Sequence, residues 1–154
     1  MPRITPNLWF DTQALDAAEY YVSVFPNSRI TDVSRMGPGG PVLTASFELD
    51  GQPYLALNGG PQFRFTEAVS FVIDCADQAE VDRYWDELVS GGGEEGQCGW
   101  LKDRFGLSWQ VVPRALVELL TDADPGRAMR AGIALQSMRR IDVAALEAAA
   151  NAAA

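Results

Sequence analysis

The residues of this chain that could take part in chemistry are mainly amides, hydroxyls and aromatic rings. The chain contains no histidine, which is the usual general base near neutral pH and a common metal ligand. The remaining candidates are tryptophans on predicted strands and polar residues at or near strand positions: Trp9, Trp100, Trp109, Asn7, Asn58, Ser70 and Gln110. A concave sheet surface that carries a few amides among aromatic rings suits a small apolar or aromatic ligand. Packing in the hydrophobic core is the alternative interpretation of each tryptophan.

Other common kinds of active site lack the residues they need. The glycine clusters at 37–40, 58–61 and 91–93 match neither GxGxxG nor GxxxxGK[ST], so the usual pocket for a dinucleotide or S-adenosylmethionine is not expected. A serine triad is excluded because there is no GxSxG motif and no histidine. Lys102 is the only lysine, and its place beside a predicted hairpin turn indicates a surface residue.

Carboxylates near the predicted strands are the remaining candidates for acid and base chemistry or for binding a hard cation. They are Glu48, Asp50, Glu67 and Asp103. Asp50 and Asp103 fall in predicted turns. Glu48 alternates with apolar neighbours along its strand, so its side chain is expected to face water. These positions argue against a catalytic pair of carboxylates.

A repeat with an offset of 63 residues organises most of the chain. Short apolar runs end at Asp11 and Asp74, and each is followed by apolar residues at helical spacing. The helical positions that match at this offset are Ala18, Tyr21, Val22 and Phe25 in the first copy and Val81, Tyr84, Trp85 and Leu88 in the second. The repeat predicts a duplicated module in which each aspartate caps the following helix by accepting a backbone hydrogen bond.

Further strand-forming segments complete each module. The first copy has them at 29–36, 42–50 and 53–58, and the second has a shortened strand followed by 98–103 and 107–113. Helical spacing takes over at Arg114, where Asp124 with Pro125, and then Asp142, are expected to begin helices. We predict an α+β single domain over 1–154, with β-α-β-β-β modules at 4–60 and 68–113 and a helical tail at 114–154.

The composition is that of a globular protein, with 47% hydrophobic and 21% charged residues. A net charge of −9 disfavours a nucleic-acid partner. No apolar run reaches the roughly 18 residues of a membrane span, and the first residues do not resemble a secretory signal, so a cytoplasmic location without membrane association is expected. Cys75 and Cys98 are predicted to be buried free thiols.

Several segments give the chain a family resemblance: "LWFD", "FPNSRI", "FELDGQ", "ALNGG", "CGWLKD" and "GLSWQVVP". With the duplication, they resemble PhnB-like proteins of the glyoxalase/bleomycin-resistance (vicinal oxygen chelate) superfamily, a family that also carries a demethylubiquinone methyltransferase name. The resemblance covers about residues 3–146. It implies that the two modules form half-open shells around a cavity. It also implies that enzymes of the superfamily hold a divalent metal there, through His, Glu or Gln on the first and last strands of each module.

Matching the strand ends puts this chain's residues at the metal-ligand positions that the resemblance implies: Asn7 or Leu8, Asn58 or Leu57, Ser70, and Gln110. Gln110 is the clearest match, because "DRFGLSWQ" resembles the superfamily's aspartate-x-x-glycine turn followed four residues later by a ligand. Asparagine, serine and glutamine lack the charge or imidazole nitrogen that holds a catalytic transition metal. No tightly bound metal and no other cofactor are therefore expected.

The expected function is the binding of a small organic molecule through Asn7, Trp9, Asn58, Ser70, Trp100 and Gln110. The acidic charge is compatible with a cationic ligand, which sequestering resistance proteins of the same superfamily hold between subunits, and the resemblance implies a homodimer. Two alternatives stay open. One is an enzyme that uses a weakly bound divalent cation or a carboxylate pair, and the other is a structural domain whose cavity is filled by its own side chains. Methyltransferase activity is not expected, because the usual cofactor motif is missing.

Overall fold

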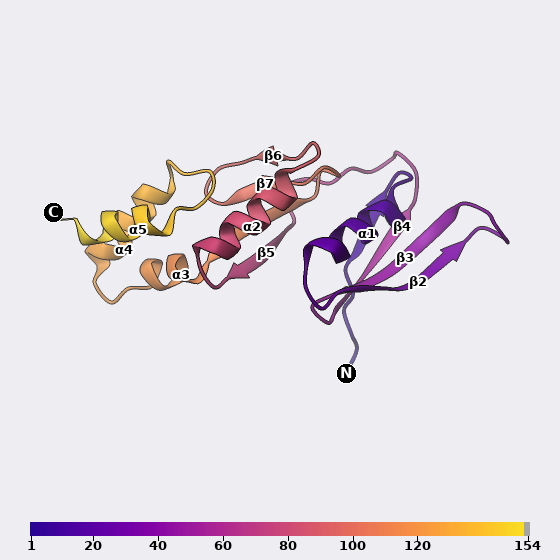
Figure 1. The fold of residues 1–154 in the computed structure, drawn as a ribbon, viewed down its shortest axis with the longest axis horizontal. Coiled ribbons are helices and arrows are strands. Elements are labelled where there is room, and N and C mark those ends of the chain that lie inside the picture. Colours follow the sequence, from indigo (N-terminus) through magenta and orange to yellow (C-terminus); the bar gives the residue numbers. More distant parts are fainter. Residues whose placement is uncertain (153–154) are drawn as a thin grey trace. The chain divides into compact units, whose positions relative to one another are not determined.

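The computed structural model describes residues 1–152. It divides into two compact units, the first from Met1 to Phe65 and the second beginning at Thr66. Figure 1 shows a helix and a four-stranded sheet in each unit, followed by further helices in the second. The two units are described separately below.

The first unit contains β1 (Asn7–Phe10), α1 (Ala14–Val24), β2 (Arg29–Arg35), β3 (Val42–Leu49) and β4 (Gln52–Asn58). Its sheet has the order β1-β4-β3-β2, and β1 runs parallel to β4. α1 packs against the sheet, and Tyr21 stacks on Phe47 with ring centroids 6.1 Å apart. Apolar residues on alternate strand positions, including Phe10, Ala45 and Ala56, are buried on this side.

The second unit repeats the arrangement with β5 (Ser70–Cys75), α2 (Gln78–Val89), β6 (Glu94–Glu95), β7 (Trp100–Lys102) and β8 (Ser108–Pro113). Its sheet has the order β5-β8-β7-β6, and β5 runs parallel to β8. The second strand, β6, has only two residues. The predicted α+β fold of two β-α-β-β-β modules is confirmed, including the shortened strand.

The helix starts differ from the prediction for Asp11 and Asp74. The N-cap of α1 is Gln13, which makes no side-chain capping bond, and the N-cap of α2 is Asp77, whose carboxylate accepts from the Glu80 N–H. Asp74 lies within β5, three residues before the cap. The prediction that Asp11 and Asp74 cap the helices is therefore wrong, because β5 and the connection after β1 extend further than the apolar runs indicate.

Three helices form the tail: α3 (Arg114–Leu120), α4 (Pro125–Leu135) and α5 (Val143–Asn151). Asp124 and Asp142 cap α4 and α5 as predicted, with acceptor bonds from the N–H groups of Gly126 and Ala145. The helices share a hydrophobic cluster that includes Leu116, Ile141 and Leu146. None of the helices within residues 1–152 is long and apolar enough to cross a membrane.

Both cysteines are free thiols, and Cys75 is fully buried whereas Cys98 is only partly buried. Burial raises the pKa of the Cys75 thiol to about 12, and the nearby carboxylates of Glu80, Asp74 and Asp77 add to this shift. A thiol with such a pKa stays protonated at neutral pH and is a poor nucleophile. Cys75 is therefore a core residue.

The turn between β7 and β8 is organised by the buried carboxylate of Asp103, which is 2% exposed. One carboxylate oxygen accepts hydrogen bonds from the backbone N–H groups of Phe105 (2.8 Å) and Leu107 (3.1 Å). The other accepts from the indole N–H of Trp109 at 2.9 Å. Gly106 completes the turn at a φ of 85°, which favours glycine. Asp103 thus fixes the alignment of β7 with β8.

We predict that Asp103→Asn lowers the free energy of unfolding of this unit by about 2 to 4 kcal/mol, because the new amide turns a donor toward groups that need an acceptor. Urea unfolding followed by tryptophan fluorescence measures the loss. Asp50→Asn is the matched control in the hairpin of the first unit, where the side chain is exposed and accepts one bond from Asn27 at 3.2 Å. It should change stability by less than about 0.5 kcal/mol. Equal effects of the two substitutions would contradict the role given to Asp103.

Candidate functional site

Each strand of the second unit has one side facing α2 and one side facing away from it. Trp109 and Val111 on β8 and Leu101 on β7 are buried on the α2 side, at most 3% exposed. Because successive side chains of a strand alternate between faces, Ser108 and Gln110 point away from α2. The same alternation puts Trp100 and Lys102 on this second face, which we call the open face.

Cross-strand register arranges the open face of the second unit in two rows. The first row runs across all four strands and is polar: Ser70 pairs with Ser108, Ser108 with Lys102, and Lys102 with Glu94. The second row consists of Val72, Gln110 and Trp100. A row of hydroxyl and charged side chains thus lies beside a row with an aliphatic side chain, an amide and an indole ring.

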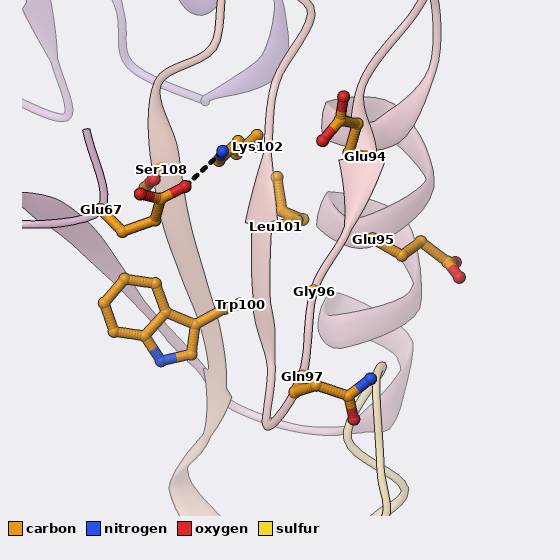
Figure 2. Close-up of a pocket in the computed structure, with 9 residues that line it drawn as sticks. All are labelled: Glu67, Glu94, Glu95, Gly96, Gln97, Trp100, Leu101, Lys102 and Ser108. Carbon is orange, nitrogen blue, oxygen red and sulfur yellow. Dashed lines mark ion pairs between the residues drawn. The ribbon is translucent and has the colours of Figure 1, made fainter. Parts of the chain in front are cut away.

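A pocket of about 410 Å³ is lined mainly by β6, β7 and the segment between them, with Ser108 of β8 and Glu67 of the segment before β5. Its lining includes Glu67, Glu94, Trp100, Leu101, Lys102 and Ser108. Figure 2 shows these side chains together with Glu95, Gly96 and Gln97, and Glu95 points away from the Glu67–Lys102 pair. Glu95 instead accepts a hydrogen bond from the Trp85 indole at 2.8 Å, so it supports the wall rather than facing a ligand.

Ser108 stands out because its hydroxyl is buried without a hydrogen bond. The residue is 1% exposed, and its Oγ has no hydrogen-bond partner among the residues that the structure describes. Buried polar groups nearly always have a partner, since leaving one unpaired costs about 1 to 3 kcal/mol. Its place in the lining of the pocket makes the Ser108 hydroxyl a candidate for binding a ligand.

Glu67 and Lys102 form an ion pair beside Ser108 (Figure 2). The hydrogen bond from Lys102 lowers the pKa of the Glu67 carboxyl, and the hydrogen bond to Glu67 raises the pKa of the Lys102 ammonium. The charge of Glu94 also raises the pKa of Lys102. Both groups are charged throughout the neutral range, so the pair carries a full positive and a full negative charge at the pocket.

Gln110 and Ser70 are neighbours on the open face. The Gln110 amide nitrogen donates a hydrogen bond to the Ser70 hydroxyl at 2.9 Å. Among residues 1–152 the amide oxygen of Gln110 makes no hydrogen bond, so it can accept one from a ligand. Two of the predicted site residues are thus in direct contact, and a third, Trp100, lies opposite Gln110 on β7.

In the first unit, Asn7 and Trp9 share the face of the sheet opposite α1. Asn7 is exposed, and Trp9 is half-buried. The Trp9 indole N–H donates to the Gly60 carbonyl at 2.9 Å, and its ring packs edge-on against Phe63. A side chain at Gly59 would collide with this ring, since an added Cβ would lie 2.3 Å from it. The tryptophan is therefore held by the segment after β4.

Asn58 lies on the other side of the same sheet, next to the start of α1. It pairs with the buried Phe10, and its side-chain oxygen accepts from the N–H of Ala14 at 2.8 Å. Its amide nitrogen donates to the Val42 carbonyl at 3.1 Å. Asn58 therefore supplies the capping bond that Asp11 was expected to make. The residue that corresponds to Gln110 in the first unit is Leu57, which pairs with Trp9 as Gln110 pairs with Val72.

The register allows a test of whether the implied metal positions fit a metal. They hold Asn7 and Leu57 on one sheet and Ser70 and Gln110 on the other, which is two amides, one hydroxyl and one alkyl group. No cluster of three or more His, Cys, Asp or Glu side chains that could hold a metal occurs within residues 1–152. Neutral oxygen donors of this kind do not fit a tightly held transition metal.

Of the residues that line the pocket, only Trp100 was predicted as a site residue. The others include Ser108, Lys102 and Glu67. Strand alternation could have identified the first two, because Ser108 is two residues before Gln110 and Lys102 is two residues after Trp100. Lys102 was expected to be a surface residue, yet it is only partly exposed and lines the pocket. Glu67 comes from the irregular segment before β5, and no sequence pattern connects it with Lys102.

A family model described as 3-demethylubiquinone-9 3-methyltransferase matches residues 2–112 of the chain. The match includes both modules up to β8 and ends before the helical tail. A comparison with curated protein sequences gave no match.

Solved structures of similar proteins agree with the family match. A PhnB protein from Bacillus cereus, titled a putative 3-demethylubiquinone-9 3-methyltransferase, is 30% identical with a TM-score of 0.66, over 73% of this chain and 99% of that chain. Protein PA1353 from Pseudomonas aeruginosa is 18% identical with a TM-score of 0.59, over 73% and 98% of the two chains.

The fosfomycin resistance protein FosX from Listeria monocytogenes, complexed with Mn(II) and sulfate, is 15% identical with a TM-score of 0.53, over 77% of this chain and 94% of that chain. At such low identity, FosX and PA1353 support the fold alone. The chain belongs to the PhnB-like 3-demethylubiquinone-9 3-methyltransferase family of the glyoxalase/bleomycin-resistance superfamily.

Proposed function

We propose that the chain binds a small organic molecule on the open face of the second unit. The observation that carries this proposal is the buried Ser108 hydroxyl, which lacks a partner among the described residues and lines the pocket. A ligand that bonds this hydroxyl would remove the cost of burying it unpaired. The nearby Trp100 ring offers apolar area for the body of the same molecule.

Gln110 and Ser70 complete the proposed site next to the pocket. Their mutual hydrogen bond orients the Gln110 amide and leaves its oxygen as an acceptor for the ligand. Asn7 and Trp9 stay predicted ligand-binding residues on the sheet of the first unit. We assign the Asn58 amide a structural role, because its oxygen accepts from the Ala14 N–H at the start of α1 and its nitrogen donates to the Val42 carbonyl at the start of β3.

The proposal involves no tightly bound metal, because the donors at the implied positions are neutral and one of them is Leu57. The second candidate function is an enzyme with a weakly bound divalent cation, and the carboxylates of Glu67 and Glu94 at the pocket favour it. We do not propose methyltransferase activity, despite the family's name. In residues 1–152 the connections from β1 to α1 and from β5 to α2 contain no glycine, so neither can form a glycine-rich cofactor loop. A homodimer and a cytoplasmic location remain predictions.

Metal analysis separates the two candidate functions. We expect the protein, purified without chelators, to contain substoichiometric amounts of manganese, iron, zinc, nickel and copper by mass spectrometry. Treatment with a chelator should leave ligand affinity unchanged, and so should addition of excess Mg²⁺, Ca²⁺ or Mn²⁺, which tests a cation that is bound too weakly to survive purification. Stoichiometric metal, removed by the chelator together with ligand binding or an activity, would favour the enzyme and contradict the proposal.

Substitution of Gln110 tests the site itself. A thermal-shift screen of small organic acids, amines and neutral aromatics should first identify compounds that raise the melting temperature. Gln110→Leu should then weaken binding of these compounds by about 1 to 3 kcal/mol while the fold survives, because one hydrogen-bonding group is lost.

Asn58→Ala is the matched control, an amide substitution in the other unit. It should lower the melting temperature, because it removes the capping acceptor of α1, and it should leave ligand affinity unchanged. The proposed site is wrong if Gln110→Leu affects only stability, or if no compound in the screen binds.

A further inference from the structure

Lys102 is the cationic residue of the polar row on the open face. It lies between Ser108 and Glu94 in the register of the sheet and is the only lysine of the chain. Its ammonium group contacts the Glu67 carboxylate, and the side chain remains 40% exposed. The Lys102 ammonium is thus accessible at the pocket and has a strong preference for a carboxylate partner.

Glu67 is not part of the sheet that carries Lys102. It belongs to the irregular segment between β4 and β5, and its side chain is 59% exposed. Thr66 and Ala68 on either side of it are exposed as well. Rotation of the Glu67 side chain would therefore free Lys102 without breaking a hydrogen bond between strands. An exposed ion pair of this kind contributes little stability, so its exchange for another carboxylate is inexpensive.

Ser108 provides a second donor directly beside Lys102. The two residues are paired across β8 and β7, and in Figure 2 the Ser108 side chain is drawn beside that of Glu67, to which its hydroxyl makes no hydrogen bond. A hydroxyl and an ammonium on paired strand positions are two donors, as the two oxygens of one carboxylate require. Trp100 lies two residues before Lys102 on the same face, roughly 7 Å along the strand. An aromatic ring joined directly or by a short linker to a carboxylate would reach both.

We propose that the pocket recognises an aromatic carboxylic acid, whose carboxylate replaces that of Glu67 on Lys102 and accepts a hydrogen bond from Ser108, while its ring packs on Trp100. This inference rests on the proposed function and names the class of its ligand. In the free protein, Glu67 occupies the place of the ligand's acid group and so competes with it.

A cationic ligand is the alternative, since three carboxylates, Glu67, Glu94 and Glu95, line the pocket. Such a ligand would have to separate Glu67 from Lys102 and bring a second positive charge close to the ammonium. A carboxylate ligand instead exchanges with the carboxylate already present, and Lys102 stays neutralised throughout. The displaced Glu67 returns to water, where an ionised carboxylate is well solvated. The existing ion pair at Lys102, rather than the net charge of the lining, therefore favours the acid.

The test compares 2-naphthoate with 2-naphthamide and 2-naphthylmethylamine, which share the ring and differ in charge, by isothermal titration calorimetry. Naphthoate should bind the natural protein at least tenfold more tightly than the amide or the amine. Lys102→Met should reduce naphthoate affinity to that of the amide and leave amide affinity unchanged. Glu67→Gln should raise naphthoate affinity severalfold, because the internal competitor is lost.

Arg83→Met and Glu87→Gln serve as matched controls, because they break a surface ion pair of 3.3 Å on α2. Neither should change naphthoate affinity, and circular dichroism should show that all four variants fold. Equal binding of naphthoate and naphthamide, or unchanged selectivity in Lys102→Met, overturns the carboxylate assignment but leaves the proposed binding function intact. Tighter binding of the amine, or no binding of naphthoate where other compounds bind, overturns it equally.

Discussion

The buried carboxylate of Asp103 is the constraint on which the candidate site depends. It holds the backbone of the β7–β8 turn through Phe105 and Leu107 and, at the same time, ties down the Trp109 indole on the α2 side of the sheet. The alignment of β7 with β8 follows from this turn. A shift of one residue would exchange the two faces of a strand, which would turn Ser108 and Gln110 toward the core and Trp109 toward the pocket.

Much of the fold could be predicted because it repeats. The offset of 63 residues identified both modules, and the spacing from Asp103 to Gln110 correctly indicated a turn followed by a strand. The helix starts could not be predicted from the same pattern, since an aspartate after an apolar run does not reveal how far the strand continues. Asp74 remains in β5 for that reason, and Asp77 takes the capping position.

The candidate site was only partly predictable. Ser70, Trp100 and Gln110 were identified from strand position, and they lie on one face. The choice between Asn58 and Leu57 required the register of a parallel strand pair, which depends on contacts between residues far apart in sequence. The ion pair of Lys102 with Glu67 depends on the path of the irregular segment that carries Glu67. The lack of a hydrogen-bond partner for the Ser108 hydroxyl depends on how all the surrounding residues pack in three dimensions. Local sequence contains neither kind of information.

The open face of the second unit carries unfavourable features that folding alone does not explain. Within the described part of the chain, residues 1–152, the Ser108 hydroxyl is buried without a hydrogen-bond partner, and two carboxylates are close to a single lysine. Proteins tolerate such local costs where a ligand later compensates for them. The positions implied for a metal hold amides and an alkyl group instead of metal ligands. This is consistent with a ligand site in which recognition depends on hydrogen bonds, charge and an aromatic surface.

The Ser108→Ala variant tests most directly the claim that the Ser108 hydroxyl binds a ligand. If the claim is right, the substitution weakens ligand binding without lowering stability. Without ligand, removal of an unpaired buried hydroxyl should leave the free energy of unfolding unchanged or raise it by up to about 1 kcal/mol. Affinity for the compounds that bind the natural protein should fall by about fivefold or more. A variant that loses stability and binds those compounds as before would show that Ser108 is structural, and the account of the open face as a ligand site would be wrong.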